Sequence, residues 1–125
     1  MPESTPRRVA VIGASSNRKK FGNRALRAFL RQGYDVVAIN PNESVVEGLR
    51  TYATVLDVPG AIDMATFYVP PHVGLVVIDQ VADKGISEVW LNPGSESQAL
   101  VERARQRGIE PIEACSVMAI GEVPS

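Results

Sequence analysis

Short apolar segments alternate with amphipathic helical patterns along this chain of 125 residues. Five apolar runs have the length and composition of buried strands, at residues 8–14, 34–40, 62–69, 87–92 and 109–115. Helical patterns follow three of them, over residues about 22–32, 71–85 and 95–108. Strands alternating with helices form parallel sheets with right-handed crossovers. We therefore predict a three-layer, doubly wound α/β fold with about five parallel strands in the order 3-2-1-4-5.

Two segments have no clear pattern. Residues 41–61 are less regular, although "TVLDVP" at 54–59 is compatible with one helical turn, and the tail from Ser116 to Ser125 is expected to be irregular. The N-terminal residues 1–6 are expected to form a disordered lead without the apolar region of a signal peptide. Residues 7–125 are expected to form a single domain, in line with common domain sizes.

Composition excludes several function classes. The net charge of −1 gives no global attraction to nucleic acids or anionic membranes, so neither is expected as a partner. No apolar run is long enough to span a bilayer. A single cysteine excludes an intrachain disulfide and suits a cytoplasmic protein. The sequence has no HExxH motif or Cys/His cluster, so no metal site is expected.

The first strand runs into a glycine turn in "VAVIGASSNRKKFGN", residues 9–23. A helix N-terminus after such a turn binds phosphate. Ser15 and Ser16 add hydroxyl groups, and Arg18, Lys19 and Lys20 add positive charge, although solvated basic side chains are an equally good interpretation. This placement makes the predicted fold Rossmann-like.

The same loop argues against NAD. Ser15 and Arg18 stand where a dinucleotide-binding loop has its second and third glycines. The second strand ends in Asn40-Pro41, without the acid that bonds the ribose 2′-OH. A small NAD(P)-linked oxidoreductase is therefore an alternative rather than the favoured interpretation.

Parallel sheets bind ligands at the carboxyl ends of their strands. The loops expected at that edge are 13–21, 40–44, 69–72, 92–95 and the segment after Cys115. The prolines of "YVPPHV" make a rigid wall without N–H donors, which suits an aromatic ring or an apolar chain. Prolines also commonly begin helices, and this simpler interpretation stays open.

"VAVIGASSNRKKFGN", "VVAINPN", "FYVPPHV" and "VWLNPG" occur in this order. Together they resemble the small stand-alone CoA-binding domain proteins, which are similar to the N-terminal CoA-binding domain of the succinyl-CoA synthetase alpha subunit. The resemblance covers about residues 7 to 121. It implies a Rossmann-like CoA site with the pyrophosphate at the Gly13 turn.

The resemblance also implies which residues bind CoA or an acyl-CoA. The first loop would contribute Gly13, Ala14, Ser15, Ser16, Lys19, Lys20 and Phe21. Asn40, Pro41 and Asn42 would flank the nucleotide, and Val69, Pro70 and Pro71 would line the adenine or the pantetheine. Asn92, Pro93 and Gly94 would lie toward the thiol, with Cys115 nearby. This chain departs from the family at two positions. Many relatives carry arginine where this chain has Asn42, and some carry arginine where it has Val69.

No pattern of side chains indicates catalysis. His72, the single histidine, is interpreted as an exposed residue at a helix start rather than a ligand contact. Cys115 is the one candidate nucleophile, either a buried core residue or a thiol able to form a mixed disulfide with CoA. We expect non-catalytic CoA binding. A CoA-binding subunit of an acyl-CoA ligase that works with a partner is another alternative, and a homodimer is compatible with the sequence.

Overall fold

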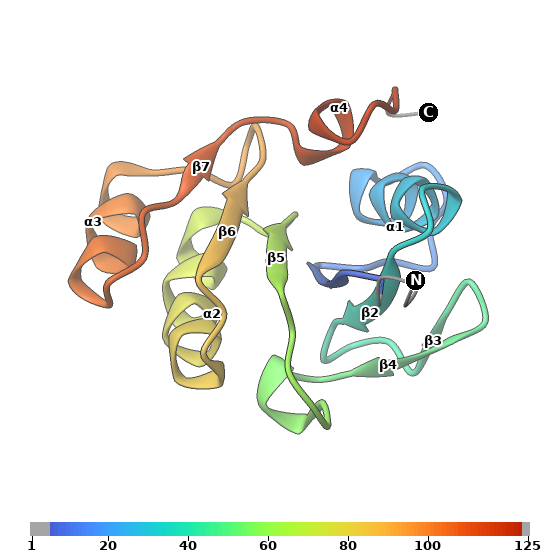
Figure 1. Ribbon diagram of the computed structural model, residues 1–125, viewed down its shortest axis with the longest axis horizontal. Helices are drawn as coiled ribbons and strands as arrows, with labels where there is room; N and C mark the ends of the chain where they lie inside the picture. Colours follow the sequence, from blue (N-terminus) through green and yellow to red (C-terminus); the bar gives the residue numbers. More distant parts are fainter. Residues whose placement is uncertain (1–5, 124–125) are drawn as a thin grey trace, which may run out of the picture.

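The computed structural model describes residues 6–123, which form a seven-stranded sheet in the order β3-β4-β2-β1-β5-β6-β7 (Figure 1). Neighbouring strands are parallel except for the antiparallel β3–β4 hairpin. The strands are β1 (Arg8–Ile12), β2 (Asp35–Ile39), β3 (Val45–Val46), β4 (Leu49–Tyr52), β5 (Met64–Phe67), β6 (Glu88–Leu91) and β7 (Ile112–Glu113).

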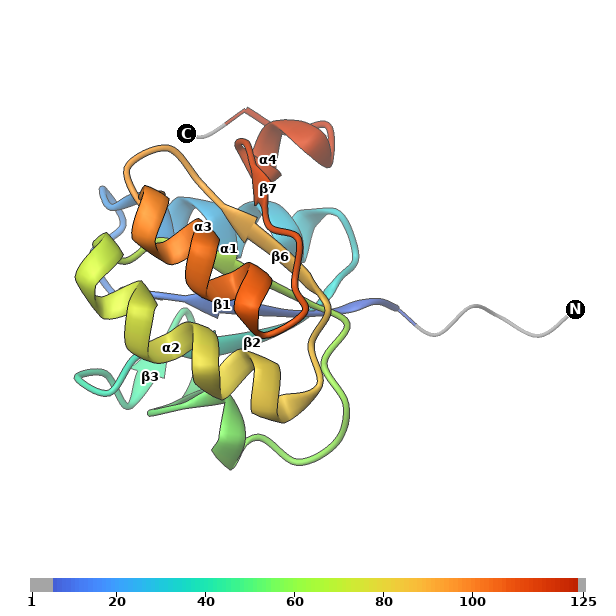
Figure 2. The same ribbon diagram turned by 90° about the vertical axis from the view of Figure 1, so that its left-hand side faces the viewer.

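Helices cover both faces of the sheet and confirm the three layers. Helices α2 (Pro71–Lys84) and α3 (Gln98–Gln106) lie side by side on one face, as Figure 2 shows. Helices α1 (Phe21–Arg31) and α4 (Ser116–Ala119) lie together on the other face (Figure 1), while the 3-10 turn η1 (Val55–Asp57) packs beside α2. Strand β1 is in the centre, and its Val9, Ala10 and Val11 are fully buried, as expected for a strand covered on both faces.

The predicted strand order, 3-2-1-4-5 from five strands, is wrong. The run at 62–69, counted as the third strand, contains β5, which pairs with β1 and β6. Strand β4 takes the place beside β2 instead. It escaped prediction because it lies toward the sheet edge, where Arg50 is exposed and only Thr51 is buried, so no apolar run marks it. When β4 is counted and β3 is set aside, the order 3-2-1-4-5-6 is that of a doubly wound sheet.

The tail is also more regular than predicted. Ser116–Ala119 form the single turn α4, and Val117 packs with Ala25 and Ala28 of α1. One turn of helix is unstable alone, so tertiary contacts must stabilise it. The predicted lead over residues 1–6 lies almost entirely outside the described residues.

Candidate functional site

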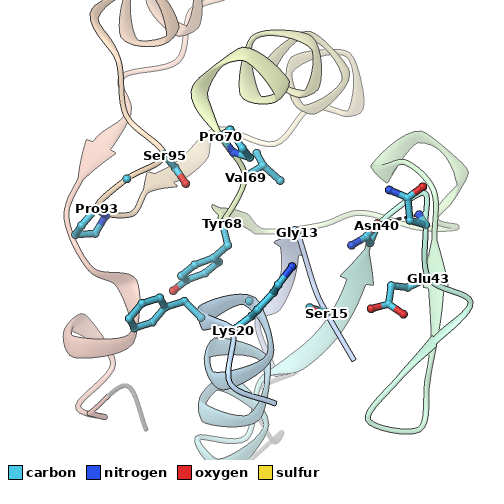
Figure 3. A pocket seen from close by; sticks show the side chains of 14 residues that line it. Gly13, Ser15, Lys20, Asn40, Glu43, Tyr68, Val69, Pro70, Pro93 and Ser95 are labelled. Carbon is cyan, nitrogen blue, oxygen red and sulfur yellow. Dashed lines mark hydrogen bonds between the residues drawn. The ribbon is translucent and has the colours of Figure 1, made fainter. Parts of the chain in front are cut away.

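A cleft of about 760 Å³ opens at the carboxyl edge of the sheet, where the sequence places it (Figure 3). Four loops meet there, after β1, β2, β5 and β6. The lining residues that the sequence predicted are Gly13, Ser15, Lys20, Phe21, Asn40, Asn42, Val69, Pro70, Pro93 and Gly94. The lining residues that it missed are Gly22, Glu43, Tyr68 and Ser95.

The remaining predicted residues lie elsewhere. Asn92 and Cys115 line a smaller pocket that adjoins the cleft. Ala14 is fully buried, and Ser16, Lys19, Pro41 and Pro71 line neither space. Ser95, the first residue of the predicted third helix, lies in the cleft instead. The cap of α3 is Ser97, whose hydroxyl accepts from the N–H of Leu100 (3.1 Å).

The turn after β1 requires glycine at position 13. Gly13 has a φ of 91°, and a β-carbon there would lie 2.6 Å from the carbonyl oxygen of Tyr68. The N–H groups of Gly13 and Ala14 donate to the carbonyl of Ile39 at 3.0 and 3.2 Å. These two amides therefore hold the turn against β2 and are occupied before any ligand arrives.

Free donors appear instead at the start of α1. Lys20 is the N-cap and makes no side-chain capping bond, and the first turn contains no acid. The N–H groups of Phe21 and Gly22 donate to no described residue, and both residues line the cleft. Unpartnered N–H groups and the helix dipole favour an anion at this position. Lys20 adds a positive charge to the same wall.

A buried amide holds the loop between β1 and α1. Asn23 is fully buried, and its Nδ2 donates to the carbonyl of Ser15 (2.8 Å) and to Glu47 (3.1 Å). Its Oδ1 accepts from Nε of Arg27 (2.8 Å). Asn40 ties the same loop to the next one, because its Nδ2 donates to the carbonyl of Ala14 (2.8 Å). The loop geometry is therefore set by the protein itself.

A carboxylate that the sequence analysis missed also lines the cleft. Oε2 of Glu43 accepts from the N–H of Ser16 at 2.6 Å. This bond, helped by the positive charge of Lys20, lowers the pKa of Glu43 and keeps it ionised. The signal in the sequence was an acid only four residues beyond the end of β2. Glu43 therefore holds the first loop through Ser16 and places negative charge at this end of the cleft.

The opposite end of the cleft is apolar. Figure 3 shows Tyr68 and Pro93 on the side away from Asn40 and Glu43. Phe21, which is 59% exposed, joins this wall. Aromatic rings and proline offer apolar surface to a ligand, and proline adds no backbone donor. The cleft therefore changes from polar to apolar along its length.

Beneath the apolar end lies a buried hydrogen-bond network. Nδ2 of Asn92 donates to Oγ1 of Thr66 (2.7 Å) and to the carbonyl of Phe67 (2.8 Å). Its Oδ1 accepts from the N–H of Ser116 (2.9 Å), which holds the start of α4. Burial raises the pKa of Tyr68, whose hydroxyl lies 3.2 Å from Oγ of Ser116, so this phenol stays neutral.

Other features of the described chain add no chemistry to the cleft. His72 is exposed and lines neither space, in agreement with the interpretation favoured from the sequence. Within residues 6–123, no three His, Cys, Asp or Glu side chains cluster closely enough to hold a metal ion. None of the helices in this part of the chain is long and apolar enough to cross a membrane.

Known structures share this architecture. A conserved hypothetical protein from Pyrococcus furiosus superposes with a TM-score of 0.85 at 35% identity, over 90% of this chain and 98% of the other. A hypothetical protein from Pyrococcus horikoshii OT3 has the same fold, with a TM-score of 0.86 at 24% identity, over 96% of each chain.

Several curated relatives are ADP-forming ligases. The chain is 34% identical over 118 residues to the alpha subunit of acetate–CoA ligase [ADP-forming] II of Pyrococcus furiosus, which covers 86% of this chain and 26% of that subunit. It is 31% identical over 90 residues to 4-hydroxybutyrate–CoA ligase [ADP-forming] of Nitrosopumilus maritimus. This match covers 70% of this chain and 13% of that ligase. The chain thus spans about a quarter or less of these relatives. The model of the CoA binding domain family matches residues 7–121, which confirms the resemblance, and the chain belongs to this family of CoA-binding domains.

Proposed function

We propose that the protein binds coenzyme A or an acyl-CoA in the cleft and does not turn it over. The observation that carries this proposal is the uncapped start of α1, where Phe21 and Gly22 line the cleft beside Lys20 and their N–H groups donate to no described residue. A pyrophosphate matches this donor set in charge and size. Membership of the CoA-binding domain family supports CoA as the ligand that carries this pyrophosphate.

The gradient from polar to apolar along the cleft suits the rest of the molecule. The nucleotide would lie toward Asn40 and Asn42, and the pantetheine would follow the walls of Val69 and Pro70. The thiol would lie near Pro93. Asn42 has no positive charge, so the 3′-phosphate would depend on Lys20 and on solvent.

The absence of turnover rests on the chemistry of the cleft wall. Among the described lining residues, Glu43 is the sole carboxylate, and its lowered pKa makes it a weak base. Tyr68 holds its proton because burial raises its pKa. The described residues of the cleft wall include no histidine or cysteine.

A second candidate follows from the relatives. The match to the Pyrococcus furiosus ligase alpha subunit covers only 26% of that subunit, which is therefore much longer than this chain. The protein would then supply the CoA site to a partner that carries the remaining ligase functions. Co-purification of such a partner, with ADP-forming acyl-CoA ligase activity that requires both proteins, would support this candidate over simple binding.

Thermal shift and calorimetry test the binding proposal. A ligand that binds only the folded state stabilises it by about 2.7 kcal/mol at 100 times its Kd. We expect stabilisation by CoA and acetyl-CoA, less by dephospho-CoA and none by NADH. Stabilisation by NADH without an effect of CoA would overturn the proposal in favour of an oxidoreductase.

A matched pair of lysines tests the place of binding. Lys20→Ala removes the cation on the cleft wall and is expected to weaken CoA binding about five- to tenfold. Lys19→Ala removes the neighbouring charge outside the cleft and is expected to have a much smaller effect. Equal effects of the two substitutions would indicate general electrostatic attraction rather than a site at the start of α1.

A further inference from the structure

A second pocket, of about 150 Å³, adjoins the apolar end of the cleft. It shares Phe21, Tyr68 and Pro93 with the cleft, so the two spaces have a common wall. We propose that this side pocket receives a short, uncharged acyl chain carried on the sulfur of CoA. The inference rests on the proposed function and adds to it the class of acyl group.

The walls of the side pocket are chemically neutral. Besides the shared residues, it is lined by Ala25 of α1, by Val117 of α4, and by Asn92 and Cys115. No lysine, arginine, histidine or carboxylate is among these described residues. Methyl groups, a thiol and ring surfaces favour an apolar occupant.

The side-chain amide of Asn92 lines the pocket, but its hydrogen-bonding groups already have partners in the protein. Both hydrogens of Asn92 Nδ2 are donated, to Thr66 and to the carbonyl of Phe67, and its Oδ1 accepts from Ser116. A carboxylate at the end of a succinyl or malonyl group would lose its water and find no positively charged side chain among the described lining residues, and the Tyr68 hydroxyl already lies 3.2 Å from Oγ of Ser116. Burial of such an unpaired charge is strongly unfavourable. The pocket therefore selects against charged acyl groups.

The volume limits the length of the chain. An apolar cavity of about 150 Å³ accommodates benzene, which corresponds to roughly six carbon atoms. A chain of about four to six carbons would fill the side pocket, whereas an acetyl group would leave most of it empty. A longer chain would have to extend back into the cleft.

The position of the pocket agrees with the direction of a bound CoA. In Figure 3, Tyr68 and Pro93 lie across the cleft from Asn40 and Glu43. A CoA with its nucleotide toward Asn40 carries its thiol toward Tyr68 and Pro93, which are the shared walls of the side pocket. The acyl chain would then enter between these side chains and Phe21.

Calorimetry under reducing conditions tests the proposal with CoA and its acetyl, butyryl, hexanoyl, dodecanoyl and succinyl thioesters. Each methylene buried strengthens binding about fourfold, so butyryl-CoA is expected to bind at least tenfold more tightly than acetyl-CoA. The gain is expected to level off beyond hexanoyl-CoA, and succinyl-CoA is expected to bind no better than acetyl-CoA. A flat series, or a preference for succinyl-CoA, would overturn the proposal.

Two substitutions at one position locate the effect. Cys115→Phe places a ring in the side pocket and is expected to reduce the butyryl-to-acetyl affinity ratio from about ten to about one. Cys115→Ala leaves the space open and is expected to keep the ratio, which separates an acyl pocket from a reaction of the thiol. If the butyryl-to-acetyl affinity ratio of Cys115→Phe stays at about ten, the acyl chain does not lie in the side pocket and the proposed location is wrong.

The outcomes separate this inference from the function on which it rests. If no CoA species binds, both the proposed function and the acyl pocket are wrong. If CoA binds but all of its thioesters bind with the same affinity, the proposed function stands and the acyl pocket alone is wrong. The chain-length series on the unaltered protein makes this distinction even if Cys115→Phe does not fold.

Discussion

Gly22 lies so close to Gly13 that a β-carbon on Gly22 would stand 2.1 Å from the carbonyl oxygen of Gly13. The first turn of α1 therefore packs directly on the turn that ends β1. Because Gly22 also lines the cleft and its N–H donates to no described residue, the contact sets the position of the donors that we propose bind the pyrophosphate. Two glycines nine residues apart thus build one site.

Gly22→Ala tests this contact through the sign of its effect on stability. Without the clash, alanine in a helix would stabilise the protein by about 1 kcal/mol relative to glycine. We expect destabilisation of about 2 kcal/mol or more instead, because backbone atoms must move apart. Urea unfolding measures the change, and CoA binding is expected to be lost with it.

Gly48→Ala is the control for backbone strain alone. Gly48 has a φ of 79° and open space around its Cα, in the hairpin between β3 and β4. Its substitution is expected to cost about 1 kcal/mol and to leave CoA affinity intact. A stabilised Gly22→Ala protein with normal binding would contradict the close packing described above.

Asn92→Leu is expected to destabilise the protein by about 3 kcal/mol, because leucine leaves the buried N–H of Ser116 without its acceptor and removes the bonds to Thr66 and to the carbonyl of Phe67. Urea unfolding again provides the measurement. Ser97→Ala, which removes the partly buried cap of α3, gives a reference cost of about 1 kcal/mol. A loss for Asn92→Leu no larger than this reference would show that the network contributes little.

Glu43→Gln is expected to strengthen CoA binding about two- to fivefold, because it removes a negative charge from a wall that faces phosphates. Glutamine can still accept from the N–H of Ser16, so the loop is retained. The gain should be larger for CoA than for dephospho-CoA and should shrink at high salt. Weaker binding would instead assign Glu43 to a ligand hydroxyl as a hydrogen-bond acceptor.

Acid is expected to destabilise the fold through carboxylates whose pKa is lowered by arginine. Bonds from Arg31 and then Gln32 lower the pKa of Glu122, and Arg103 and Arg107 lower that of Asp79. Unfolded carboxyls bind protons more readily, so this stability is present above pH ~4.3 and is lost as the pH falls through the lowered folded values. Urea unfolding between pH 3 and 6 measures the slope, and Glu122→Gln should reduce it. An unchanged slope would show that the bond between the tail and α1 is not coupled to folding.

Much of the site could be predicted from local sequence. Gly13 after an apolar strand, and Pro70 and Pro93 at the ends of later strands, marked the carboxyl edge correctly. Glu43 and Tyr68 were missed because nothing in their neighbours distinguishes a side chain that faces a cleft from one that faces solvent or core. Ser95 and Ser97 are both plausible helix caps, and only the packing of α3 chose between them.

The sequence by itself determined the layers, the glycine turn and the edge that carries the cleft, because hydrophobic periodicity and the φ of glycine are properties of a few adjacent residues. Only the tertiary structure decided that β5 lies beside β1 while β4 lies beside β2. It also brought Asn92 to Ser116 and so closed the side pocket with α4. Strand neighbours and buried hydrogen bonds join residues far apart in the chain, and they depend on the packing of the whole core rather than on any local pattern.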